Sequence, residues 1–113
     1  MSSPSPGGFR IVYLLPARAA ARDRLSHAPA LGLLAPLKAA LLRIHDQLTN
    51  DPVGWGNPLY FLHHLGITIN TAFEWDIFVS YGVDVANRLV CVRTMQLMPR
   101  NPLNAPPSGG AVP

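Results

Sequence analysis

The spacing of apolar residues predicts a strand at the start of the folded part of the chain. Residues 9–15 combine β-branched and aromatic side chains and are followed by Pro16, a composition that is typical of a strand. Apolar side chains fall on both parities of this segment. We therefore expect other elements to cover the strand on both sides over part of its length.

Two helices are predicted next along the chain. Residues 17–26 are rich in alanine and arginine, which favour helix, and Pro16 stands where the first turn of a helix tolerates proline. Residues 36–49 form the second helix, because four aliphatic residues recur there at spacings of four, three and four: Leu37, Leu41, Ile44 and Leu48. The sequence Asn-Asp-Pro at residues 50–52 ends this helix, and residues 53–58 are expected to form a loop.

Three strands are predicted in the second half of the chain. The segment 58–70 contains the first, and the segments 75–83 and 88–98 contain the second and third, because apolar and polar residues alternate in them. The connections around residues 70–74 and 84–87 have the length of hairpin turns. We therefore expect the three strands to be antiparallel neighbours.

This order of elements, β-α-α-β-β-β, predicts a two-layer α+β domain. The helix hairpin packs on one face of a mainly antiparallel sheet, and the other face, called the open face below, is the natural working surface. The domain is expected to span residues 9–99. Residues 1–8 and the Pro/Gly-rich residues 100–113 are expected to be disordered tails.

Composition adds to this picture an expectation of a partner. Apolar residues make up 49% of the 113 residues, enough for one core, but only 13% are charged, which is about half the usual share of ~25%. Such a surface suits a protein partner. The net charge of +3 is a weak indication of nucleic-acid binding, and arginine enrichment is equally typical of GC-rich genomes.

The sequence indicates no membrane segment, metal site or cofactor. The N-terminus lacks the apolar run of a signal peptide, and the most apolar stretch, residues 28–42, is interrupted by proline and glycine, so we expect a cytoplasmic protein. His63 and His64 would point to opposite faces of a strand, so they would not hold one metal ion together. Cys91 is the single cysteine, which excludes an intrachain disulfide.

Candidate functional residues are those that the predicted strands place on the open face. His64 is a candidate general base, because histidine is the side chain best suited to that role near neutral pH, and Arg93, a cation inside a strand, would contact a phosphate or a partner carboxylate. A salt bridge from Arg93 to Asp76 is the structural alternative. Four polar residues are predicted to form a binding surface: Thr68, Asn70, Asp76 and Ser80.

Four aromatic residues are suited either to stacking on bases or to packing in the core: Trp55, Tyr60, Trp75 and Tyr81. Trp75 and Tyr81 share the apolar parity of their predicted strand, which favours the core.

The order of these elements, with four segments of the sequence, resembles the RelE/ParE superfamily of toxins from type II toxin–antitoxin systems. The segments are Phe-Arg-Ile-Val-Tyr at 9–13, Asp-Pro-Val-Gly-Trp-Gly-Asn-Pro-Leu at 51–59, Ile-Phe-Val-Ser-Tyr at 77–81 and Arg-Leu-Val-Cys-Val-Arg at 88–93. The likeness extends over residues 9–99 and is closest to divergent members. It consists of a pattern of elements and apolar strands rather than a signature motif.

The resemblance implies a growth-inhibiting, plasmid-stabilisation type toxin that is neutralised by a cognate antitoxin. RelE-like members cleave mRNA on the ribosome, and ParE-like members inhibit DNA gyrase. This sequence departs from the nuclease pattern, because Asp76 stands where an arginine is common and the last strand lacks the usual His-Arg ending. Only Arg93, His64 and Tyr81 would substitute as catalytic residues.

Three hypotheses follow from these observations. The first is a toxin that binds its cellular target. The second is a degenerate, non-toxic binding module of the same fold, which the loss of basic positions favours. The third is an mRNA endoribonuclease of the RelE type, and the sequence leaves open whether the protein is an enzyme.

Overall fold

One five-stranded sheet organises the protein. The computed structural model describes residues 8–104. The strands are β1 (Arg10–Tyr13), β2 (Asn57–Leu62), β3 (Ile67–Glu74), β4 (Ile77–Asp84) and β5 (Leu89–Leu97). They lie in the order β1-β5-β4-β3-β2, with β1 parallel to β5 and every other pair of neighbours antiparallel.

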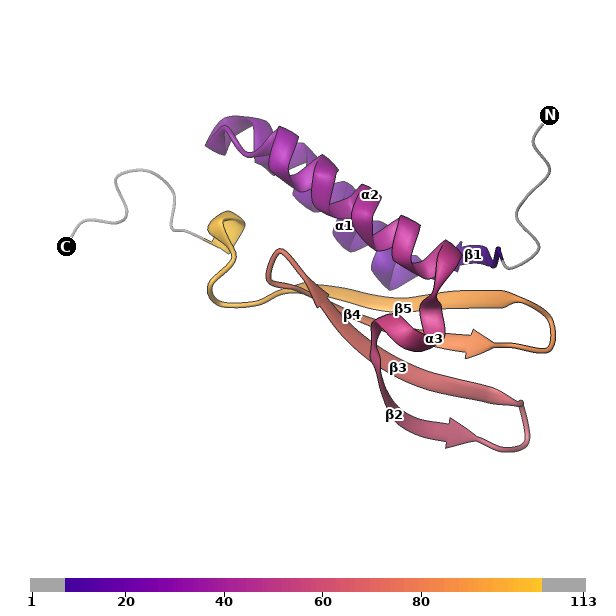
Figure 1. Cartoon of the computed structure of the whole chain (residues 1–113). Helices are drawn as coiled ribbons and strands as arrows, with labels where there is room; N and C mark the ends of the chain where they lie inside the picture. Colours follow the sequence, from indigo (N-terminus) through magenta and orange to yellow (C-terminus); the bar gives the residue numbers. More distant parts are fainter. Residues whose placement is uncertain (1–7, 105–113) are drawn as a thin grey trace, which may run out of the picture.

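Two long helices, α1 (Leu15–His27) and α2 (Leu34–Asn50), lie together along one side of this sheet (Figure 1). A 3₁₀ turn (Ala28–Leu31) connects them and ends at Gly32, whose φ of 70° suits glycine. A backbone hydrogen bond of 2.9 Å from Phe9 to the Thr49 carbonyl ties the entry to β1 to the end of α2. The predicted α+β class, with a helix pair on one face of a mainly antiparallel sheet, is confirmed.

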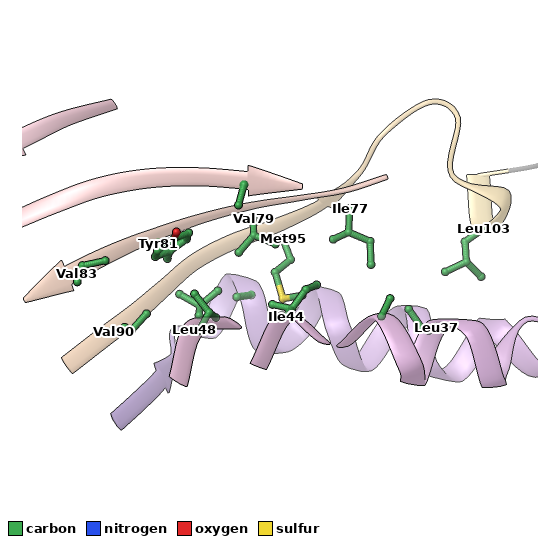
Figure 2. Packing of buried hydrophobic residues seen from close by; sticks show 14 of the residues in the cluster. Leu37, Ile44, Leu48, Ile77, Val79, Tyr81, Val83, Val90, Met95 and Leu103 are labelled. Carbon is green, nitrogen blue, oxygen red and sulfur yellow. The ribbon is translucent and has the colours of Figure 1, made fainter. Parts of the chain in front are cut away.

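The hydrophobic core lies between the two helices and the strands β4 and β5. Figure 2 shows Leu37, Ile44 and Leu48 of α2 directed toward the sheet. The facing side of the sheet is made of buried aliphatic side chains: Val79, Val83, Val90, Val92 and Met95. Each fully buried aliphatic side chain contributes about 1.5–3 kcal/mol relative to exposure. This layer therefore holds the helices to one face only.

A short helix, α3 (Pro52–Trp55), occupies part of the segment predicted to be a loop. The Asp51 carboxylate accepts a hydrogen bond from the Gly54 amide at 3.1 Å, and Pro52 fills the first turn. Residues 50–52 thus both end α2 and start α3.

Tyr81 of β4 holds α3 against the helix side of the sheet. Its hydroxyl donates a 2.7 Å hydrogen bond to the Pro52 carbonyl, and Trp55 stacks on its ring with centroids 5.8 Å apart. Burial raises the pKa of the Tyr81 hydroxyl, so the hydroxyl keeps its proton and acts as a donor at neutral pH. The alternative that placed Tyr81 in the core is confirmed.

The predicted strand within residues 58–70 is in fact two strands, β2 and β3. A four-residue turn at 63–66 separates them, and Gly66 adopts a left-handed φ of 66° there. The sheet therefore has four antiparallel strands after the helices instead of the predicted three.

The next turn also differs from the prediction. Trp75 and Asp76 have φ values of 52° and 54° and form the two-residue turn between β3 and β4, so residues 70–74 belong to a strand. Two successive positive φ values mark a primed hairpin turn, which Asn-Gly normally signals in a sequence. The Trp-Asp pair carries no such signal.

The folded domain continues past its predicted end at residue 99. Asn101 is 2% exposed and donates a 2.7 Å hydrogen bond from its Nδ2 to the Trp75 carbonyl, and Leu103 packs into the core. The remaining parts of the two predicted tails, residues 1–7 and 105–113, lie outside the described residues.

Replacing Tyr81 by phenylalanine is expected to lower the free energy of unfolding by about 1–2 kcal/mol, because the Pro52 carbonyl loses its short hydrogen bond inside the protein. The matched control is Tyr60→Phe on the exposed edge strand, which should change the stability by less than about 0.5 kcal/mol. Urea unfolding followed by circular dichroism measures both. Equal effects of the two substitutions would contradict the role of the Tyr81 hydroxyl.

Candidate functional site

The open face of the sheet is lined by a patch of apolar side chains around Gly82. In the strand register, Gly82 of β4 pairs with Ile69 of β3 and with Cys91 of β5. A Cβ on Gly82 would lie 2.9 Å from Cγ2 of Ile67, which shows how closely the β3 side chains lean over β4. Ile69 is only 4% exposed although no helix within residues 8–104 covers this face. The apolar residues of the open face thus shield one another.

Arg93 and Tyr60 form a polar contact across this patch. Arg93 donates a 3.3 Å hydrogen bond from Nη1 to the Tyr60 hydroxyl, which joins the central part of β5 to the edge strand β2. Both side chains are exposed, so both are available to a ligand or partner. A guanidinium beside a phenol hydroxyl, over apolar side chains, suits contact with a carboxylate, a phosphate or an aromatic group.

Arg93 lies on the open face at a β-bulge of β5. Tyr81 pairs with Val92 and Ser80 pairs with Thr94, so Arg93 is the extra residue on β5 and has no partner of its own in the register. Val92, the residue before it, is fully buried against the helices. The bulge leaves Arg93 unpaired and returns Met95 to the helix side opposite Val79, so the pairing continues on either side of it.

The structure brings together only two of the predicted open-face residues. Ser80 lies on the open face, 9% exposed, in the register next to the bulge that holds Arg93. His64 lies in the turn between β2 and β3, and Asp76 lies in the turn at the opposite end of β3. His64 and Asp76 are therefore separated by the length of a strand. The assignment of His64 to the open face of a strand is wrong, and so is the alternative salt bridge from Arg93 to Asp76, since the described contact of Arg93 is with Tyr60.

Thr68 and Asn70 lie on the helix side of the sheet, so their predicted place on the open face is wrong. They pair with Val83 and Tyr81, whose side chains point into the core. Asn70 is 2% exposed and lies under α3, with its Nδ2 3.4 Å from the Pro52 carbonyl. The prediction places the isoleucines of β3 on the helix side. In the structure, α3 instead places the Pro52 carbonyl over that side, where Asn70 contacts it, and Ile67 and Ile69 line the open face.

Tyr81 is also separated from the other predicted catalytic residues. Its ring is fully buried on the helix side, and its hydroxyl is engaged with Pro52. His64, Arg93 and Tyr81 thus occupy a turn, the open face and the core, respectively, and do not form one constellation.

The sequence predicts Tyr60 only as an aromatic residue for stacking or packing, whereas the structure places it beside Arg93 on the open face. The sequence signal that could identify Tyr60 is an aromatic residue in a strand that carries no charged residue, Asn57–Leu62. In the structure the side chain of Tyr60 is exposed. The sequence analysis predicts a single strand within residues 58–70 and so does not separate β2, which carries Tyr60, from β3.

The described part of the chain holds neither a metal-ligand cluster nor a helix that could cross a membrane. Within residues 8–104, no three His, Cys, Asp or Glu side chains lie close enough to hold a metal ion. Neither long helix of the described residues combines the length and the apolar character that a membrane crossing requires.

One solved structure with a similar fold is a chain of the toxin–antitoxin complex RelBE2 from Mycobacterium tuberculosis. The TM-score is 0.56 at 18% sequence identity, and the alignment covers 84% of this chain and 97% of that chain. The fold is RelE-like. No protein-family model and no curated protein sequence matches the chain. The resemblance to the RelE/ParE superfamily is thus confirmed for the fold.

Replacing Arg93 by alanine is expected to change the free energy of unfolding by less than about 0.5 kcal/mol, because the side chain is exposed and its one hydrogen bond is long. The matched control is the neighbouring Val92→Ala, which should cost about 2 kcal/mol because it opens a cavity in the core. Urea unfolding measures both. A loss above about 2 kcal/mol for Arg93→Ala would show that Arg93 has a structural role instead.

Proposed function

We propose that this protein is the toxin component of a type II toxin–antitoxin system, inhibits growth by binding a cellular target and is neutralised by an antitoxin. The observation that carries the proposal is the fold likeness to a chain of the RelBE2 toxin–antitoxin complex, which extends over 97% of that chain. A role in plasmid stabilisation belongs to the same proposal.

The surface supports a function that depends on protein partners. Large apolar side chains are exposed on the helices, on the edge strand and on the open face, among them Leu15 (75%), Leu42 (70%), Leu59 (63%) and Phe73 (56%). Exposed apolar residues in this number, on a chain with only 13% charged residues, favour association with other proteins.

The geometry supports target binding over RNA cleavage. A cleavage site needs an acid, a base and phosphate-binding cations within hydrogen-bond reach of one substrate. The predicted catalytic residues His64, Arg93 and Tyr81 do not meet in one place, and the Tyr81 hydroxyl already has a partner. We therefore assign target contact to the open face around Arg93, Tyr60 and Ser80, with DNA gyrase and the ribosome as the candidate targets.

Tightly controlled expression of the chain in bacteria tests the proposal. Induction is expected to stop growth, and co-expression of the protein encoded by the adjacent small open reading frame is expected to restore it. The two proteins should also copurify. Growth that is unaffected by a folded, well-expressed chain would contradict the proposal and favour the degenerate, non-toxic module.

The same experiment separates target binding from RNA cleavage. Arg93→Ala is expected to relieve growth arrest at least tenfold in plating efficiency, because it removes the guanidinium group at the centre of the proposed target surface. Total mRNA should remain intact during arrest by the parent chain. Rapid mRNA cleavage that His64→Ala and Arg93→Ala both abolish would support the endoribonuclease instead.

A further inference from the structure

A groove between α1 and α2 remains open on the helix side of the protein. Its volume is about 360 Å³. Ile44 and Met95, which face each other in Figure 2, form its buried floor, and Leu25 and Leu41 form its half-buried sides. We call this hollow the α1–α2 groove.

The groove exists because α1 carries small side chains on the side that faces α2, and these do not fill the space between the two helices. Ala20 and Ala21 stand on the side of α1 where a packed helix hairpin normally carries larger apolar residues. Ala21 lines the groove, and α1 rests chiefly on β5 rather than on α2. Leu25 of α1 and Leu41 of α2 are left half-buried, so a further apolar surface can be buried here without rearrangement.

The groove runs along one face of α1. The four α1 residues that line it, Arg18, Ala21, Arg22 and Leu25, follow the spacing i, i+3, i+4 and i+7. Seven residues of helix extend over about 10 Å, or two turns. An elongated apolar groove of this kind accepts a helix that presents apolar residues at the same spacing.

The rim of the groove is positively charged. Arg18 and Arg22 are exposed, lie one turn apart and take part in no ion pair with the described residues, and no acidic side chain lines the groove. The hydroxyl of Tyr13 at the edge is already hydrogen-bonded to Nδ1 of His45 at 2.9 Å. The guanidinium groups of Arg18 and Arg22 are thus available to pair with carboxylates of a ligand. Such a ligand would carry these carboxylates next to the apolar side chains that enter the groove.

We propose that the α1–α2 groove binds an acidic amphipathic helix of a partner protein, whose leucine-like side chains fill the space over Ile44 and Met95 while its carboxylates pair with Arg18 and Arg22. The inference rests on the proposed function in taking the antitoxin as that partner. The phosphates of a nucleic acid could pair with the two arginines, but its polar sugar–phosphate backbone would then cover the apolar floor of the groove. The groove therefore favours a protein, which can supply apolar side chains for the floor and carboxylates for the arginines.

Peptide binding to the full chain tests the proposal. The probe is a synthetic helix of about 20 residues with leucine along one face and glutamate on the flanks, and its twin carries lysine in place of every glutamate. Ala21→Leu fills the groove and should raise the Kd of the acidic peptide at least tenfold. The matched control Ala19→Leu, on the exposed side of α1, should leave the Kd within twofold.

Charge reversal supplies a second, independent variant. Arg18→Glu/Arg22→Glu should weaken the acidic peptide at least tenfold and strengthen the lysine peptide, while urea unfolding shows that the fold persists. Equal binding of the two peptides to the parent chain, or an unchanged Kd for folded Ala21→Leu, would overturn the proposal. Direct binding of decanoate at micromolar concentration, with no binding of either peptide, would also overturn it, in favour of a small amphiphilic anion.

The outcome is separable from that of the proposed function. If the chain arrests growth and its antitoxin binds Ala21→Leu as tightly as the parent, the groove proposal is wrong and the toxin function stands. If the chain is harmless but binds the acidic peptide in a way that Ala21→Leu abolishes, the groove stands as a protein-docking site and the toxin function is wrong.

Discussion

The contact between the Tyr81 hydroxyl and the Pro52 carbonyl is the point on which the arrangement of this protein depends. It joins the middle of β4 to α3, the segment that leads from α2 in the helix layer to β2 at the edge of the sheet. Gly56 continues the chain through a space so narrow that a Cβ would lie 2.5 Å from the Tyr81 hydroxyl and 2.6 Å from the Thr71 carbonyl oxygen. This packing determines where β2 begins, and hence where the β2–β3 hairpin lies beside β4.

Small residues keep a space available on each side of the sheet. Gly82 lets Ile67 and Ile69 lean across β4, so the open face carries a self-shielding apolar patch with Arg93 and Tyr60 above it. On the helix side, alanines of α1 leave the α1–α2 groove. Two partner surfaces on opposite sides of one sheet suit a protein that contacts both a target and an antitoxin.

The sequence predicts the elements whose patterns are local. Both long helices and the strands β1 and β5 follow from apolar spacing and from proline and glycine positions. The Trp75-Asp76 turn and α3 do not, because positive φ values at Trp and Asp and a four-residue helix are imposed by their packing. Tertiary packing here overrides local preference.

The candidate site was predicted less well than the fold, for the same reason. Alternation placed Thr68 and Asn70 on the wrong face, because α3 offers a buried polar partner on the helix side. Arg93 is predicted on the open face and lies there, because it alternates with Val90 and Val92, which are buried against the helices. Its partner Tyr60 belongs to a strand that the prediction merged with the next one.

The central claim is that this RelE-like chain is held by a protein partner on its helix side. Hydrogen–deuterium exchange of the full chain, alone and in complex with the protein of the adjacent small open reading frame, tests it most directly. We expect slower exchange in the complex within residues 18–25 of α1 and 41–44 of α2, which line the groove. Slower exchange confined to β2–β5, with both helices unchanged, would contradict it.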